Sequence, residues 1–274
     1  MKTLGDLIRA SQEGNVPPLI MGIVNVTPDS FSDGGAFYEA ELACAHAMRL
    51  VKQGADLIDC GAESTRPGYS PVDVEEEWRR LAPVVTSLVA RGICVSVDTM
   101  KAEIARRVLE AGAVMINDIW GLHRDGDMAS VVAAHGAQLV VMHNREEIDP
   151  NLDMKADFRR FFDISLEKAH FAGIASGAIV LDPGIGFGKT PEQNLKALRH
   201  LAWLKQEYRL PILLGLSRKS LFGYFLGRPK DERLPATIAA NLYGIREGAS
   251  ILRVHDVKAH EDAVLLDYML RGVS

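Results

Sequence analysis

The feature that most constrains the fold is a pattern that the sequence repeats eight times. A short aliphatic run ends at a polar or glycine-rich segment, and a longer amphipathic stretch usually follows. Parallel strands covered on both faces have such continuous apolar runs, and crossover helices have such amphipathic stretches. The predicted strands cover residues 19–26, 57–59, 93–97, 114–116, 138–142, 178–181, 211–214 and 250–254. The predicted helices cover residues 39–53, 74–91, 101–111, 158–172, 191–207, 234–247 and 259–270.

Eight strands joined by helical crossovers predict a closed β/α barrel, which typically needs about 250 residues. The chain has 274 residues, of which 47% are hydrophobic, so it can bury one core of this size. We therefore predict a single-domain (β/α)8 TIM barrel of the α/β class over residues 19–274, preceded by an N-terminal extension over residues 1–18. The alternative is an open doubly wound sheet, but no GxGxxG pattern follows the first predicted strand.

Charge and composition exclude several classes of partner. The formal net charge is -5, from 31 Lys and Arg against 36 Asp and Glu without a block of like charge, so we expect no nucleic-acid partner. No uncharged stretch reaches the ~18 residues of a spanning helix, and we expect a cytoplasmic protein that does not bind a membrane. Cys44, Cys60 and Cys94 are too widely spaced for a CxxC site, and we expect reduced thiols.

Polar residues end all eight predicted strands. In a parallel barrel the carboxyl ends of the strands open on one face, so these side chains should meet in one pocket although they are far apart in sequence. A single strand-end Asp or Asn is equally well explained as the cap of the following helix, but eight such ends together favour a site. The residues are Asn25, Asp59, Asp98, Asn117, His143, Asp182, Ser217 and Arg253.

Two of the following loops carry groups that suit phosphate and its counterion. Asn25 precedes a loop of turn formers and small hydroxyls, and its amide oxygen suits magnesium, although an Asn that closes a tight turn explains it as well. Arg66 lies beside Pro67 and Gly68, and its planar guanidinium can make two contacts with an oxyanion.

Later loops point to a flat ligand and a second phosphate contact. The glycines between Gly184 and Lys189 are one residue short of a P-loop, so they indicate close backbone approach to a ligand rather than nucleotide binding. The last two strands end at Ser217-Arg218-Lys219 and at Arg253-Val254-His255, where barrels commonly bind phosphate. Arg253 and His255 are two residues apart and should point the same way in extended chain.

Seven ordered segments together resemble dihydropteroate synthase over residues 19–271. They are the Asn25 loop and residues 63–68, 95–99, 116–119, 182–190, 217–220 and 253–256. The resemblance implies a transferase of folate biosynthesis that joins a dihydropterin pyrophosphate to p-aminobenzoate with magnesium, through a pterin cation. It also implies a homodimer and a target of sulfonamides.

The resemblance further implies a role for each matching residue. Asp98, Lys219 and Arg66 would be catalytic. Asp98, Asn117, Asp182 and Lys219 would bind the pterin, and Asn25 would contact the magnesium on the pyrophosphate. The pyrophosphate would be bound by Thr65 and by cationic Arg66, Arg253 and His255. The p-aminobenzoate pocket would be shaped by Phe31, Pro67, Phe187 and Ser217.

The sequence differs from the family at two positions, and two other functions remain as alternatives. Ala62 stands where Gly is common, and Leu216 stands where Thr often precedes Ser-Arg-Lys, so we expect Leu216 to change the shape of the amine pocket. A pterin-binding methyltransferase that serves a corrinoid protein would share the barrel and the pterin-binding residues. A non-catalytic pterin-binding subunit would keep the fold without turnover.

Overall fold

The strands form one closed parallel barrel. The computed structural model describes residues 3–26, 35–63 and 72–272, with side chains at 35–38 excepted. Neighbouring strands follow the order β6-β5-β4-β3-β2-β1-β8-β7, and a bridge between Leu181 and Ile212 joins β6 to β7 and closes the sheet. The predicted eight-stranded barrel is confirmed. The strands are β1 (Leu19–Asn25), β2 (Leu57–Gly61), β3 (Val95–Asp98), β4 (Met115–Asp118), β5 (Gln138–Met142), β6 (Ile179–Asp182), β7 (Leu213–Leu214) and β8 (Ile251–Val254).

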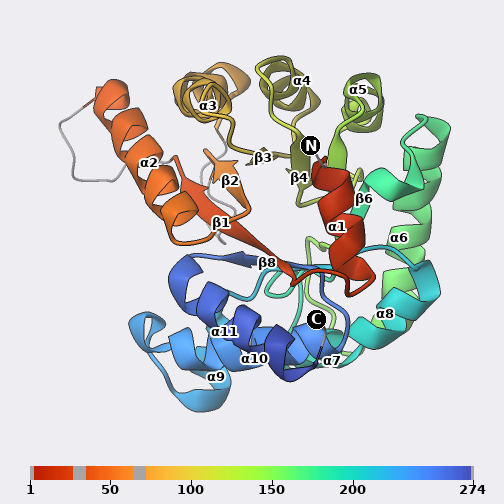
Figure 1. Cartoon of the computed structure of the whole chain (residues 1–274). Coiled ribbons are helices and arrows are strands. Elements are labelled where there is room, and N and C mark those ends of the chain that lie inside the picture. Colours follow the sequence, from red (N-terminus) through yellow and green to blue (C-terminus); the bar gives the residue numbers. More distant parts are fainter. Residues whose placement is uncertain (1–2, 27–34, 64–71, 273–274) are drawn as a thin grey trace.

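Helices surround the strands on the outside of the barrel (Figure 1). The described helices are α1 (Leu4–Gln12), α2 (Gly35–Lys52), α3 (Val74–Val89), α4 (Ala102–Glu110), α5 (Met128–His135), α6 (Met154–Phe171), α7 (Pro191–Arg199), α8 (Leu201–Tyr208), α9 (Ser220–Leu226), α10 (Leu234–Arg246) and α11 (Val257–Leu270), with short 3-10 helices η1 (Ser176–Ala178) and η2 (Lys230–Glu232). None of them is long and apolar enough to cross a membrane.

Side chains alternate between the inside and the outside of the barrel along each strand. Leu57 packs in the inner apolar cluster, Ile58 packs in the cluster under the helices, and Asp59 points inward again. The same two-residue period leads from Met115 to Asn117 on β4. The inner positions are therefore apolar at the amino ends of the strands and polar at the carboxyl ends, which places the polar groups at one mouth.

Helix α1 covers the amino-terminal mouth, where Figure 1 shows it lying across the strands. Thr3 caps this helix with a reciprocal capping box to Asp6, and Leu4 and Ile8 pack into the inner apolar cluster. The Ser11 hydroxyl donates to the Ser250 carbonyl at 3.0 Å. The predicted N-terminal extension thus contains a helix that closes one end of the barrel, and polar groups remain at the opposite end.

The helices differ from the prediction in two ways. The stretch 191–207, predicted as one helix, is two helices, α7 and α8, because the backbone at His200 (φ -95°, ψ 5°) departs from helical geometry. Helices α1, α5 and α9 were not predicted. Helix α5 has eight mostly apolar residues without a polar face, and α9 contains Gly223 within only seven residues, so neither has the amphipathic period on which the prediction relied.

Candidate active site

Asp59 and Asp98 share one arginine at the carboxyl mouth of the barrel. The Arg253 Nε donates to Asp59 Oδ2 at 2.6 Å, and its Nη2 donates to Asp98 Oδ2 at 2.9 Å. Asp59 is fully buried and also accepts from Ser96 Oγ at 2.6 Å and from Asn117 Nδ2 at 3.1 Å. Side chains from β2, β3, β4 and β8 therefore form one hydrogen-bonded group.

The strand register explains why these residues meet. Asn25 pairs with Gly61, Gly61 pairs with Asp98, and Asp98 pairs with Asn117 across four neighbouring strands. Each pair points to the same face of the sheet, so the polar strand ends share one level of the barrel. A Cβ on Gly61 would lie 3.4 Å from the Cβ of Asp98, so the glycine leaves room beside that carboxylate.

Burial dominates the electrostatics of this group. It raises the pKa of Asp98 to about 7 because desolvation disfavours the carboxylate and Asp59 adds repulsion, although Arg253 opposes both. It also lowers the pKa of Lys219 to about 8, with Arg253 acting in the same direction and Asp182 and Asp98 opposing. Titratable groups with such displaced pKa values are typical of catalytic and binding sites.

Asp182 and Lys219 contribute an acceptor and a donor from β6 and from the loop after β7. Asp182 Oδ1 accepts from the Gly184 amide at 2.7 Å, and burial raises the pKa of this carboxyl to about 6 despite that bond. The Lys219 Nζ lies 4.2 Å from the centroid of the Phe187 ring. Lys219 interacts electrostatically with both Asp182 and Asp98, so this pair and the Asp59 group belong to one site.

The site contains polar atoms that no described residue satisfies. Asn117 Oδ1 is buried and has no hydrogen-bond partner. Within the described residues, Asp182 Oδ2 and Lys219 Nζ make no hydrogen bond either. Buried polar atoms normally find a partner, so Asn117 Oδ1 points to a ligand that brings a donor. Asp182 Oδ2 can accept from the same ligand, and Lys219 Nζ can donate to it. Beside the Phe187 ring, such a ligand would be flat and rich in nitrogen and oxygen.

Ser217 and His255 lie side by side at the ends of β7 and β8. Ser217 Oγ accepts from the His255 amide at 3.1 Å and lies 2.9 Å from His255 Nδ1. If the Ser217 hydroxyl donates to Nδ1, the ring proton lies on Nε2, from which a ligand can accept it. Burial, followed by Arg253 and Arg218, lowers the pKa of His255 to about 4. Without a ligand the imidazole is therefore expected to be neutral, and the cationic contact of His255 with pyrophosphate stays a prediction.

Arg218 makes a structural contact beside the site. Its Nε and Nη2 donate to the two carboxylate oxygens of Asp256 at 2.9 and 2.5 Å. This bidentate pair joins the loop after β7 to the start of α11, and it brackets His255. Arg218 is therefore occupied, while Lys219 and His255 remain available to a ligand.

Several predicted site residues cannot be placed in this geometry. Phe31, Thr65, Arg66 and Pro67 lie outside the described residues. Phe31 falls in residues 27–34, and the other three fall in residues 64–71. The second segment is bounded by Glu63 and Val72, and Lys101 Nζ contacts both, at 2.5 Å from Glu63 Oε2 and 2.7 Å from the Val72 carbonyl. Lys101 also bonds buried Glu77. One ammonium group therefore fixes both ends of the segment.

Two positions differ from the expectation. His143 ends β5, but its side chain is fully buried and bonds Asp157 and Lys189 rather than the other strand-end residues. Leu216 is also fully buried and belongs to the apolar cluster under the helices. The expectation that Leu216 changes the shape of the amine pocket is therefore wrong. Ala62 packs in the same cluster.

Sequence reasoning missed the importance of two residues. Asp59 was recognised only as a strand end, yet it accepts three hydrogen bonds at the centre of the group. The available signal was the period of two from inward Leu57, which makes Asp59 an inward carboxylate. Lys189 was considered only as part of a failed P-loop pattern, and no local signal indicated that it is buried.

Comparisons with known proteins agree with this geometry. The family model described as "Pterin binding enzyme" matches residues 21–255. A curated dihydropteroate synthase of Clostridium beijerinckii is 45% identical over 92% of this chain and 94% of its own length.

Two solved structures are similar throughout. Dihydropteroate synthase of Xanthomonas albilineans with 4-aminobenzoic acid is 43% identical, has a TM-score of 0.89 and covers 94% of each chain. That of Anaplasma phagocytophilum with bound 6-hydroxymethylpterin-monophosphate is 36% identical, has a TM-score of 0.87, and the match covers 93% of this chain and 100% of that one. With a barrel, a polar mouth and relatives that agree over nearly the whole length, this chain belongs to the pterin binding enzymes, in the family of dihydropteroate synthases.

Proposed function

We propose that the enzyme condenses 6-hydroxymethyl-7,8-dihydropterin pyrophosphate with p-aminobenzoate to give 7,8-dihydropteroate and pyrophosphate. The observation that carries the proposal is the buried, unsatisfied Asn117 Oδ1 in the same mouth of the barrel as Asp182 Oδ2 and Lys219 Nζ, which make no hydrogen bond within the described residues. Relatives with similar folds bind the two halves of this chemistry, a pterin monophosphate and 4-aminobenzoic acid.

The pterin fits the unsatisfied atoms by its hydrogen-bonding pattern. A pterin presents an amino group and a ring N–H side by side, and Asp182 can accept from this edge while Asn117 Oδ1 accepts a further donor. Lys219 then donates to an oxygen or nitrogen of the ring, beside the face of Phe187. The ionised form of Asp182 is needed because only a carboxylate accepts from two donors at once.

The leaving group would lie toward β7 and β8. Ser217 and His255 pair there through the Ser217 hydroxyl, and Arg253 brings the only positive charge that β8 contributes within its described residues 251–254. Thr65 and Arg66, in the segment that Lys101 bounds, complete the predicted contacts to pyrophosphate. Donors placed where negative charge grows stabilise the transition state more than the ground state.

The reaction course follows from that charge distribution. The bond from the pterin methylene carbon to the pyrophosphate oxygen breaks with its electron pair leaving on pyrophosphate, which produces a pterin cation. The carboxylate of Asp98 stabilises this cation by charge, and the p-aminobenzoate nitrogen then forms the new C–N bond and loses a proton. Phe31, Pro67, Phe187 and Ser217 would shape the pocket that holds the amine.

Magnesium would be held chiefly by the pyrophosphate, with Asn25 as the contact from the protein. Asn25 is exposed at the end of β1, and its side chain makes no hydrogen bond to another described residue. A single neutral amide oxygen suits magnesium that keeps waters and substrate phosphates as its other ligands. The described residues contain no cluster of three or more His, Cys, Asp or Glu for a metal, which fits a substrate-held ion. The ion supplies counter-charge to the leaving group.

The assembly and compartment are also part of the proposal. We place the enzyme in the cytoplasm as a homodimer. The exposed apolar side chains Leu265, Leu266, Met269 and Leu270 on α11 offer a surface that a second copy could cover. Cys44, Cys60 and Cys94 are all free thiols, as expected for a reducing compartment.

Turnover with dihydropterin pyrophosphate, p-aminobenzoate and magnesium tests the proposal. We expect release of pyrophosphate and formation of dihydropteroate, both abolished by chelating the magnesium. Transfer of a methyl group from a methylated folate to a corrinoid protein would instead identify a pterin-binding methyltransferase. Pterin binding without either reaction would identify a non-catalytic subunit.

A further inference from the structure

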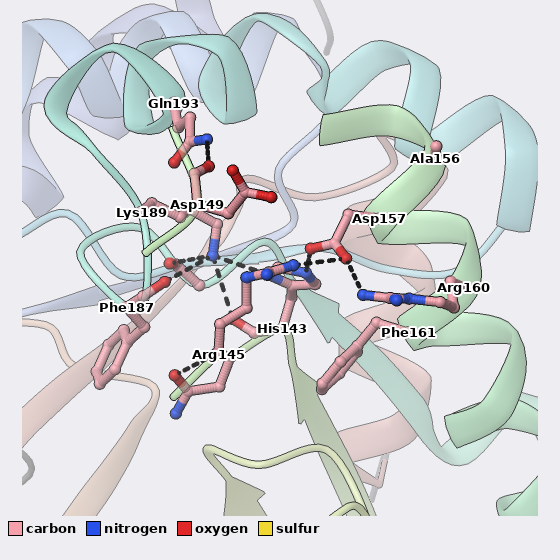
Figure 2. A network of polar contacts seen from close by, with 12 residues as sticks. His143, Arg145, Asp149, Ala156, Asp157, Arg160, Phe161, Phe187, Lys189 and Gln193 are labelled. Carbon is pink, nitrogen blue, oxygen red and sulfur yellow. Dashed lines mark hydrogen bonds and ion pairs between the residues drawn. The ribbon is translucent and has the colours of Figure 1, made fainter. Parts of the chain in front are cut away.

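Lys189 is a buried residue of the loop between β6 and α7, and the proposed reaction does not use its amine. Its Nζ lies 2.8 Å from the Gly184 carbonyl, 3.0 Å from the Phe187 carbonyl and 3.3 Å from the His143 carbonyl. A fourth contact, of 2.8 Å, joins it to His143 Nδ1. Figure 2 shows the amine at the centre of these contacts, which come from the end of β5 and from the loop between β6 and α7.

A series of hydrogen-bonded side chains extends from Lys189 through His143 to Asp157. His143 Nδ1 faces the amine, so its Nε2 carries the proton and donates to Asp157 Oδ2 at 2.9 Å. Asp157 Oδ1 accepts from Arg145 at 2.8 Å and from Arg160 at 2.6 Å. Burial alone would raise the pKa of Asp157, but hydrogen bonds from His143 and Arg145 outweigh it and hold the pKa well below its usual range. The carboxylate therefore stays charged and fixes the imidazole.

The loop that Lys189 contacts includes two of the proposed substrate contacts. Asp182 begins it and Phe187 stands near its end. Its backbone is held closely, because a Cβ on Gly184 would lie 1.8 Å from the His143 carbonyl oxygen and the Gly184 φ is +64°. The Gly184 amide in turn donates to Asp182 Oδ1 at 2.7 Å. Gly184 therefore links the two groups, because Lys189 contacts its carbonyl and its amide contacts the Asp182 carboxylate.

We propose that Lys189 is a positioning residue for the pterin, because it fixes the peptides at Gly184 and Phe187 and thereby aims the Asp182 carboxylate and the Phe187 ring into the site. Lys189 itself need not touch the substrate. The inference rests on the proposed function and adds a residue to it. Holding the backbone next to a ligand contact is how a supporting residue preserves geometry at a binding site.

Burying an amine costs free energy of desolvation, so its presence at this position supports a role beyond packing. Burial lowers the pKa of Lys189 to about 7, because the charged form loses its hydration there. The four neighbouring acceptors need a donor, and an apolar side chain could not satisfy them. The charged and the neutral amine both donate to carbonyls, so the loop keeps its support on either side of that pH.

Calorimetry on the whole enzyme with two probes tests the inference. In Lys189→Met, we expect 6-hydroxymethylpterin to bind about tenfold or more weakly, as for the loss of a charge-assisted hydrogen bond. Inorganic pyrophosphate, which would bind near His255 and Ser217, should keep its affinity within about twofold. General loosening of the barrel would weaken both ligands together, so the difference between the probes separates positioning from stability.

Hydrogen exchange gives a readout that does not depend on ligand. The loop amides of Gly184, Gly186 and Phe187 donate to the Asp182 side chain, to the Asn194 side chain on α7 and to the Gly184 carbonyl, respectively. They should exchange faster in Lys189→Met than in the wild type, while amides of β1 stay protected. Lys168→Met is the matched control, because Lys168 donates to a single carbonyl, that of Leu122, away from this loop. It should leave both probes and the loop amides unchanged.

A second variant keeps the test decisive if Lys189→Met does not fold. Asp157→Asn removes the charge that orients His143, and it should shift pterin affinity in the same direction by a smaller factor. Equal pterin affinity in wild type and in the folded variants, or equal weakening of both probes, would overturn the role of Lys189. Failure of the wild type to bind 6-hydroxymethylpterin would instead count against the proposed function.

Discussion

Arg253 on β8 and Asp98 on β3 are joined by a 2.9 Å hydrogen bond at the polar mouth of the barrel. Strands β1 and β2 separate them in the sheet, and Asp59 on β2 binds the same guanidinium. The arginine proposed to contact the leaving group therefore also organises carboxylates on the pterin side. The same hydrogen-bonded group of Arg253, Asp59 and Asp98 would therefore contact both the pterin and the pyrophosphate.

This connection makes the effects of Arg253 and His255 differ. Arg253→Ala leaves Asp59 and Asp98 without their cation, so we expect weaker binding of both 6-hydroxymethylpterin and pyrophosphate. His255→Ala should weaken pyrophosphate alone, because His255 bonds Ser217 and neither carboxylate. Loss of a charge-assisted bond corresponds to about tenfold or more in affinity, which calorimetry resolves. Selective loss of pyrophosphate binding in both variants would contradict the shared role of Arg253.

Pterin binding should weaken as the pH falls through about 6. Burial raises the pKa of Asp182 to about 6, and the protonated carboxyl can no longer accept from two N–H donors. The affinity for 6-hydroxymethylpterin, measured at pH values on either side of about 6, should therefore be higher on the alkaline side. This ligand has no phosphate whose own titration would interfere. Asp182→Asn should bind weakly and lose the dependence near pH 6, and a constant affinity in the wild type would argue against Asp182 as the acceptor.

Asp98→Asn should reduce turnover while flattening the pH dependence of stability. Burial raises the pKa of Asp98 from an ordinary 3.8 to about 7, so between these values the folded protein binds more protons than the unfolded chain. Stability from this group therefore falls as the pH rises through that window, and an asparagine has no such dependence. Urea unfolding at about pH 5 and pH 8 should show a larger loss in the wild type than in the variant. Parallel changes in the two proteins would contradict the raised pKa.

Sulfonamides should inhibit competitively against p-aminobenzoate. A sulfonamide has the same aniline ring and places a polar sulfonyl near the position of the carboxylate, so a pocket beside Phe187 and Ser217 cannot easily refuse it. Leu216 is buried under the helices and does not narrow that pocket. We expect tighter binding in the presence of pyrophosphate, with reciprocal tightening of pyrophosphate by the drug. Steady-state inhibition kinetics check the competition, and drug affinity that ignores pyrophosphate would contradict the coupling.

The fold was predictable because it depends on periodicities that lie along the chain. Continuous apolar runs identify buried parallel strands such as β1, and their number identifies a barrel. The short helices α5 and α9 were missed because seven or eight residues give too little amphipathic signal. Helix α1 carries a capping box at Thr3, which is a local signal, but its packing across the barrel mouth depends on tertiary contacts.

The site was predictable only where strand ends define it. Asp98, Asn117 and Asp182 meet because parallel strands share one carboxyl face, which any barrel requires. The direction of His143 depends on α6, which offers Asp157 and a cluster of phenylalanines around the ring. The partners of Arg253 likewise come from strands far away in sequence. A local sequence pattern does not indicate which of several distant residues will be the hydrogen-bond partner.

The contacts of Lys101 determine how the end of β2 is linked to the start of α3. Glu63 and the Val72 carbonyl both accept hydrogen bonds from the Lys101 ammonium group. Lys101, which is not part of residues 64–71, therefore sets the distance between the two residues that flank this segment. Glu63 follows β2 and Val72 precedes α3, so the same contacts also link these two elements. Substitution of Lys101 would therefore release Glu63 and Val72 at once and loosen the link between β2 and α3.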